Sequence, residues 1–160
     1  MCRIGGFRRK LVNKNDKNKE EKITGFRLDW YDCGPSVFGP LSHVRTVISR
    51  TSRSITIKHM RNQGIFYRTS IPVKKESIEG FFDALSAINW KPDYSVTACD
   101  GYSWEMRLKS ATSTVARVKG TVEPPPETKE LERMIRDMID ASGCPEIPPL
   151  WGNCYEENEE

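Results

Sequence analysis

The hydrophobic spacing within residues 76–89 constrains the fold most, because it has the period of a helix in a chain that otherwise alternates. Five apolar residues recur there at intervals of three and four positions: Ile78, Phe81, Phe82, Leu85 and Ile88. This spacing places them on one face of an α-helix. Pro92 lies just beyond the segment, as prolines often do after a helix ends. The segment predicts an amphipathic helix with one face to bury.

Strict alternation before this helix predicts strands. Phe26, Leu28 and Trp30 share one face of the segment 23–31, while Arg27 and Asp29 share the other, which is the period of a half-buried strand. The same pattern recurs in residues 44–48, 55–57 and 65–71, with a turn expected near residues 50–53. We therefore expect a β-meander ahead of the helix.

The segments 94–99 and 102–109 flank the dipeptide Asp100-Gly101, which favours a β-hairpin. A three-residue loop, 99–101, puts six side chains on the core face in facing pairs: Ala98 with Tyr102, Val96 with Trp104, and Tyr94 with Met106. This interpretation predicts a buried Trp104 and an exposed Asp100 at the hairpin tip. A further strand is expected around residues 114–120.

A second helix is predicted from about Thr128 to Ser142, with Thr128 as its N-cap and Gly143 in a left-handed terminating conformation. Its apolar stripe has five members: Leu131, Met134, Ile135, Met138 and Ile139. The chain order is then strands, helix, strands, helix. This predicts an α+β fold with a largely antiparallel sheet of five to six strands and two amphipathic helices on one sheet face.

The segment "DGYSWEMRLK" begins a pattern that continues with a glycine-containing strand and a proline before the last helix. It is preceded by "FRLDWYDCGPSVFG" and by a helix that ends near a tryptophan. From about residue 23 to 139 the chain resembles small uncharacterised bacterial α+β domains with a DGxSW motif. The resemblance implies the same fold and carries no established activity.

The length of 160 residues is right for one domain with its own core. Residues 1–22 are polar and unpatterned at their end and predict a flexible basic arm, residues 23–155 predict the single domain, and residues 156–160 predict an acidic tail. The first residues contain no apolar signal segment, and no run is long enough to span a bilayer. We expect a cytoplasmic protein that does not enter the membrane.

Charge is divided along the chain. Residues 41–75 contain eight basic side chains and no acidic one, whereas residues 121–160 contain eleven acidic and three basic ones. Such a basic strand region can bind phosphates. The candidate nucleic-acid-binding residues are Arg45, Arg50, Arg53, Lys58, Arg61 and Arg68. The sequence leaves open whether the acidic tail docks on this region.

Features of catalytic and metal sites are few. The five cysteines form no CxxC pair, so we expect reduced thiols, no metal and no cofactor, and pairing of Cys144 with Cys154 stays open. No glycine-rich phosphate loop is present. Four carboxylates, Asp29, Asp32, Asp100 and Glu105, lie on or beside strands, which an alternating polar face produces without any function.

These observations favour a non-catalytic binding or regulatory module that engages a protein partner. Three residues outside both helical stripes are the candidate contacts: Leu150, Trp151 and Tyr155. The alternative hypothesis is a nucleic-acid-binding domain that uses the basic region 41–75. A small enzyme with an unfamiliar site is the third. The oligomeric state is not predicted.

Overall fold

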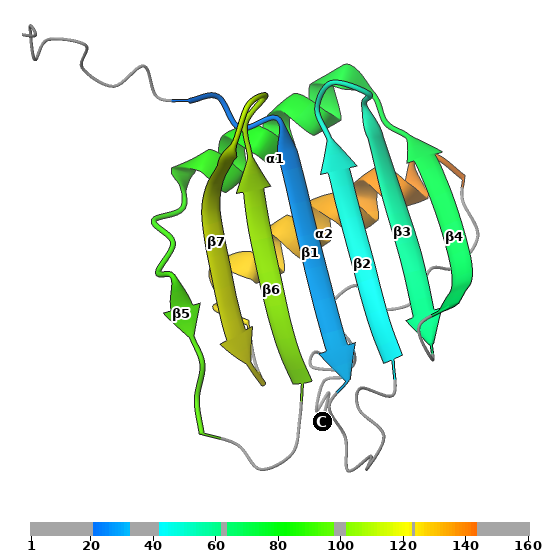
Figure 1. Cartoon of the computed structure of the whole chain (residues 1–160). Coiled ribbons are helices and arrows are strands. Elements are labelled where there is room, and N and C mark those ends of the chain that lie inside the picture. The colour runs from blue at the N-terminus through cyan, green and yellow to red at the C-terminus, as the bar shows by residue number, and fades with distance from the viewer. Residues whose placement is uncertain (1–20, 33–41, 62–63, 98–101, 123, 144–160) are drawn as a thin grey trace, which may run out of the picture.

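The computed structural model of the chain describes residues 21–32, 42–61, 64–97, 102–122 and 124–143. These residues form a layer of strands backed by a layer of helices (Figure 1). The strands are β1 (Gly25–Asp32), β2 (Ser42–Ser49), β3 (Ser54–Arg61), β4 (Gly64–Pro72), β5 (Asp93–Tyr94), β6 (Tyr102–Lys109) and β7 (Thr114–Thr121). The helices are α1 (Lys75–Ala87) and α2 (Glu127–Asp140).

The strands make one mixed sheet in the order β4-β3-β2-β1-β6-β7-β5. The first four form the expected meander, and β6 and β7 join on the other side of β1. Every pairing is antiparallel except that of β5 with β7. Seven strands exceed the five to six expected, and their order across the sheet departs from their order along the chain. β1 is the central strand and joins the two halves of the sheet.

The predicted hairpin between residues 94–99 and 102–109 is wrong. β6 lies between β1 and β7, and the two residues of β5 lie opposite Lys119 and Gly120 of β7. Val96, expected in the core, is 59% exposed. The physical reason is backbone hydrogen bonding: because β6 lies between two eight-residue strands, its N–H and C=O groups find partners along both of its edges. Trp104 is buried as predicted, while residues 98–101, including Asp100, lie outside the described residues.

Helix α1 forms where the spacing of apolar residues predicted it. Ile78, Phe81, Phe82 and Leu85 are fully buried, and Ile88 is partly buried against the same core. The ring of Phe81 meets that of Phe26 from β1 edge to face, with 5.4 Å between their centroids. The apolar stripe therefore packs on the core face of the sheet.

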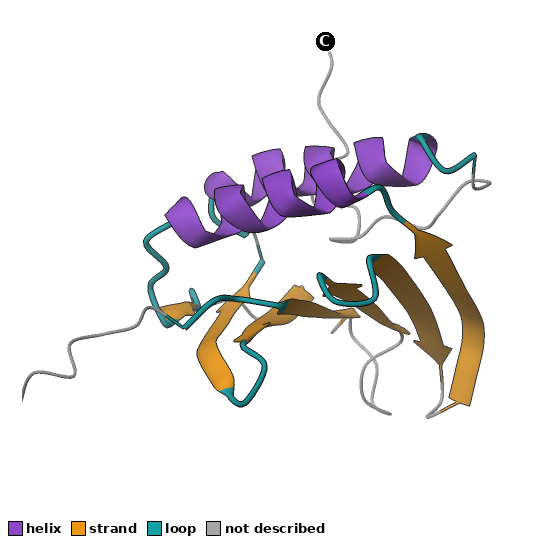
Figure 2. Ribbon diagram, turned by 90° about the horizontal axis from the view of Figure 1, so that it is seen from above, coloured by secondary structure: helices purple, strands orange, loops and turns teal. Residues whose placement is uncertain are grey.

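Helix α2 buries its own stripe beside α1, and both helices lie on one side of the sheet (Figure 2). Thr128, predicted as the N-cap, lies inside the helix instead, since Pro126 occupies the cap position. The hydroxyl of Thr128 donates to the carbonyl of Pro125 at 2.6 Å. Gly143 has the expected left-handed conformation, with φ of 70°. None of the helices in the described ranges is long and apolar enough to cross a membrane.

No described helix or strand covers the opposite side of the sheet (Figure 2). We call this surface the open face: the side chains of β1–β4, β6 and β7 that point away from the helices. Because side chains alternate along a strand, each core residue of β1 is followed by one that points away from the helices. Asp29, which lies between the core residues Leu28 and Trp30 in sequence, therefore belongs to the open face. The polar side of the sheet is therefore left uncovered by the described helices and strands.

Gly120 of β7 lies opposite Trp104 of β6, and the indole occupies the space that a side chain would need. A Cβ atom at position 120 would lie 2.6 Å from Cε2 of Trp104. We expect Gly120→Ala to lower the free energy of unfolding by about 1–3 kcal/mol, because overpacking a core forces the ring to move. Urea unfolding measures this.

Gly80→Ala is the matched control. Gly80 lies inside α1, and its new Cβ would meet only Met134 Cε at an ordinary 3.9 Å. We expect this variant to gain up to about 1 kcal/mol from helix propensity. Equal losses in both variants would contradict the packing of Trp104 on Gly120.

Candidate nucleic-acid interface

One row of cross-strand partners crosses the whole sheet and carries a charge on every strand. Asp29 of β1 lies opposite Arg45 of β2 on one side and Glu105 of β6 on the other. From β4 to β5 the row contains Arg68, Lys58, Arg45, Asp29, Glu105, Lys119 and Asp93. We call it the Asp29 row. Three consecutive basic residues occupy one end of it.

Asp29 is the buried member of this row, although it belongs to the open face. Its side chain is 1% exposed, because three longer side chains cover it. Arg27 Nε donates to Oδ2 at 2.6 Å, and Arg45 Nε donates to Oδ1 at 2.6 Å. His43 Nε2 also lies 2.6 Å from Oδ1. We call these four residues the Asp29 cluster.

The protonation of Asp29 follows from these contacts. Burial by itself raises the pKa of the carboxyl, but the hydrogen bonds from His43, Arg27 and Arg45 outweigh it. Together they hold the pKa of Asp29 well below its usual range. The carboxylate is therefore ionised at neutral pH and acts as an acceptor for all three neighbours.

Each arginine of the cluster uses only its Nε atom on the carboxylate. Among the described residues, no partner is recorded for the terminal Nη groups of Arg27 and Arg45. One negative charge thus holds two guanidiniums side by side and leaves one positive charge over. An anion that approaches the open face can accept hydrogen bonds from these Nη groups.

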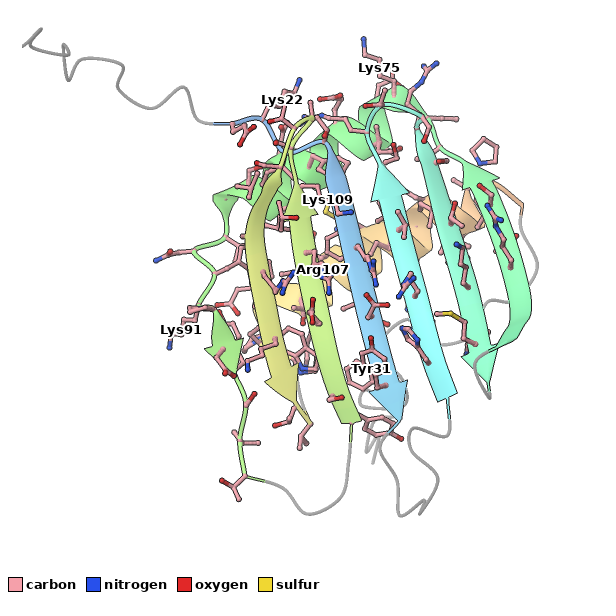
Figure 3. All side chains as sticks on the ribbon, viewed as in Figure 1. Lys22, Tyr31, Lys75, Lys91, Arg107 and Lys109 are labelled. Carbon is pink, nitrogen blue, oxygen red and sulfur yellow. The ribbon has the colours of Figure 1, made fainter. Side chains whose placement is uncertain are left out.

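Tyr31 completes the surface next to the cluster. Its ring stacks on the imidazole of His43, with 4.2 Å between centroids and 26° between planes. Burial raises the pKa of the Tyr31 phenol, so the phenol is neutral at physiological pH. The side chain projects from β1 toward the viewer (Figure 3). This pair is an aromatic surface beside the arginines.

Glu105 repeats the arrangement on the next two strands. Arg107 Nε donates to Oε1 of Glu105, and Arg117 Nε lies 3.7 Å from the same oxygen. Arg27, Arg107 and Arg117 lie opposite one another on β1, β6 and β7. Opposed like charges destabilise a sheet, and the carboxylates in the neighbouring row offset that repulsion. Two guanidiniums again share one carboxylate.

Lys58 and Arg68 extend the positive charge to β4. They face each other across β3 and β4, next to Arg45. Within the part of the chain that the structure describes, neither forms an ion pair. Among the described residues, these two charges therefore have no counter-ion.

The six predicted nucleic-acid-binding residues do not form one site. Arg45, Lys58 and Arg68 lie together in the Asp29 row, but Arg50 points to the helix side. Its guanidinium donates to Glu79 and to the carbonyl of Ile23, and lies 5.1 Å from the centroid of the Phe82 ring. Arg50 is a structural residue, because tertiary contacts with α1 claim its charge.

The other two predicted nucleic-acid-binding residues, Arg53 and Arg61, are not part of the Asp29 row. Arg53 is exposed in the turn between β2 and β3, with φ of 51° and away from the row. Nothing is described for the side chain of Arg61. Leu150, Trp151 and Tyr155, the predicted protein contacts, lie outside the described residues, as do all five cysteines.

Sequence reasoning missed Arg27, His43, Arg107 and Arg117 as members of a site. It placed Asp29 and Glu105 on strands but not opposite each other, as the register of β1 and β6 shows. The available signal was the outward position of Arg27 and Asp29 in an alternating strand. Only the strand order brings Arg107 and Arg117 beside them.

Neither protein-family models nor curated proteins gave a match to this chain. The resemblance to DGxSW domains therefore stays a prediction. In the described ranges no group of three or more His, Cys, Asp or Glu side chains could hold a metal ion.

Asp29→Asn tests the cluster. The variant removes the charge that three donors share, and breaking a buried ion pair typically costs about 3–5 kcal/mol. We expect a loss of roughly this size in the free energy of unfolding at pH 7. The folded-state pKa of Asp29 is depressed, so its stabilisation is complete above the usual value of 3.8 and is lost as the pH falls below it. Urea unfolding of both proteins at pH 7, 5 and 3 measures this.

Glu105→Gln is the control, because Glu105 is 28% exposed and solvent screens its ion pairs. We expect a loss of less than about 1 kcal/mol from it. If Asp29→Asn lowers the free energy of unfolding by no more than Glu105→Gln does at pH 7, the Asp29 carboxylate does not organise the open face.

Proposed function

We propose that this protein binds single-stranded nucleic acid on the open face of its sheet. The observation that carries the proposal is the basic end of the Asp29 row, where Arg45, Lys58 and Arg68 lie on three adjacent strands that neither of the described helices covers on this side. This deepens the alternative hypothesis from the sequence and moves its centre from the region 41–75 to the whole face.

The charge balance of the face supports a polyanionic ligand. The Asp29 row and the row that contains Arg27 hold seven basic residues and three acidic ones. The basic residues are Arg27, Arg45, Lys58, Arg68, Arg107, Arg117 and Lys119, and the acidic ones are Asp29, Glu105 and Asp93. Phosphates supply the counter-charges that these rows lack.

The extent of the basic track favours a chain of phosphates over a single small anion. Neighbouring strands lie about 4.8 Å apart, so the track from Arg45 across β3 to Arg68 spans roughly 10 Å. One phosphate ion contacts only one end of such a track. A nucleic-acid backbone that crosses the strands presents successive phosphates to it.

The aromatic pair favours a single strand over a duplex. Bases of a single strand stack on exposed aromatic rings, whereas those of a duplex are already stacked on each other. Tyr31 and His43 lie at the side of Arg45 and Asp29 on the same face. A base on this pair would leave its phosphates over the cluster arginines.

Binding is measured by fluorescence anisotropy with mixed-sequence single-stranded RNA and DNA at several salt concentrations. We expect an affinity that falls as salt rises, with a slope of about 0.7 for each phosphate neutralised. The double variant Lys58→Glu, Arg68→Glu should bind at least about tenfold more weakly and show a shallower slope. Neither residue makes an ion pair in the described structure, so the fold should be retained.

The matched control is Lys75→Glu, Lys91→Glu, which changes the net charge equally. Both lysines are exposed and lie at the margins of the molecule (Figure 3). We expect it to bind much as the unaltered protein does. Equal losses in both double variants would show a response to net charge alone and would contradict the open-face site. Absence of binding at low salt would overturn the proposed function and leave the protein-partner hypothesis.

A further inference from the structure

The Asp29 cluster contains a group that can accept a proton. Arg27 and Arg45 donate permanently to Asp29, whose carboxylate is ionised, so the imidazole nitrogen that faces Oδ1 must carry a hydrogen. That nitrogen is Nε2 of His43. In neutral His43 the second nitrogen, Nδ1, then holds the lone pair. The carboxylate has selected one tautomer of the ring.

The position of this imidazole is also held. The Asp29 carboxylate fixes its Nε2 edge at 2.6 Å, and the ring of Tyr31 stacks on its face. The side chain of His43 remains 17% exposed, and those of Arg27 and Arg45, which hold the same carboxylate through Nε, are 23% and 26% exposed. A carboxylate that orients an imidazole, with cationic donors at its side, is an arrangement used for general-base catalysis.

The chemistry that suits this arrangement is attack of a hydroxyl group on a phosphodiester. The base takes the hydroxyl proton, and guanidiniums stabilise the negative charge that develops on the phosphoryl oxygens. RNA provides the hydroxyl itself, at the 2′ position beside each phosphate. A single strand lying over the cluster therefore brings nucleophile and phosphorus together.

We propose that the open face cleaves RNA by transesterification, with His43 as the general base. This rests on the proposed binding of single strands and goes beyond the non-catalytic role expected from the sequence. Nδ1 of His43 takes the proton of the 2′-hydroxyl, and the 2′-oxygen forms a bond to the adjacent phosphorus. The bond from phosphorus to the 5′-oxygen breaks, and that oxygen takes a proton from water. The products are a 2′,3′-cyclic phosphate and a 5′-hydroxyl, and His43 returns its proton to the solvent.

The other members of the cluster have separate roles. The Nη groups of Arg27 and Arg45 bind the non-bridging phosphate oxygens. Asp29 is a positioning residue, because it touches His43 and the arginines and not the substrate. Tyr31 holds the ring face.

The test uses the full chain with mixed-sequence single-stranded RNA and its 2′-O-methyl counterpart, which has no nucleophile. We expect RNA to be cut to fragments with 2′,3′-cyclic phosphate ends, and 2′-O-methyl RNA to be bound and left intact. His43→Gln keeps a donor for Asp29 and removes the base, so cleavage should fall by at least about 100-fold while 2′-O-methyl RNA still binds. Added imidazole should restore part of the rate in His43→Gly, which a merely structural role would not allow.

The control is Glu76→Gln, a change at an exposed position in the first turn of α1 on the helix side of the sheet, which should leave the rate unchanged. Thermal unfolding of every variant shows whether its fold is kept. Binding of 2′-O-methyl RNA without any cutting of RNA would overturn the cleavage and leave the binding function standing. No binding of either strand would overturn both. Cutting at equal rates by the unaltered protein and by His43→Gln would overturn the role of His43.

Discussion

The carboxylate of Asp29 is the interaction on which the open face depends. A buried charge is costly unless donors surround it, and here Arg27, His43 and Arg45 supply three hydrogen bonds of 2.6 Å. The same bonds hold two guanidiniums close together, which would otherwise repel each other. One buried anion thus makes a dense group of cations compatible with a folded sheet, and the excess positive charge remains at the surface.

The two helices determine which face is available. Both have a single apolar stripe, and both stripes pack on the same side of the sheet, where Phe26, Leu28 and Trp30 of β1 are buried. Alternation then forces the outward residues of β1, which include Arg27 and Asp29, onto the other side. The core and the candidate site are therefore two faces of the same strand, and the pattern that builds one also positions the other.

Local periodicity predicted much of the fold. The core faces of β1 to β3, both helices, the turn at residues 50–53 and the burial of Trp104 followed from spacing within short segments. The partner of β6 did not follow, because alternation shows which residues share a face and not which strand lies beside them. The Asp100-Gly101 dipeptide suggested the preceding segment as a partner, whereas β6 pairs with β7 and with β1, which lies more than seventy residues earlier. The prediction that Arg50 binds nucleic acid was wrong for the same reason, since its partner Glu79 lies 29 residues away in sequence.

The strand topology explains why only one half of the candidate site could be predicted from the sequence. Arg45, Lys58 and Arg68 come from consecutive strands of a meander, so a run of basic sequence becomes a basic surface. Arg27, Arg107 and Arg117 become neighbours only because β6 pairs with β1. That junction would set Arg27 against Arg107 without relief if Asp29 and Glu105 were not in the adjoining row. The acids that looked like an ordinary polar face are thus what permits the two basic halves of the sheet to meet at β1.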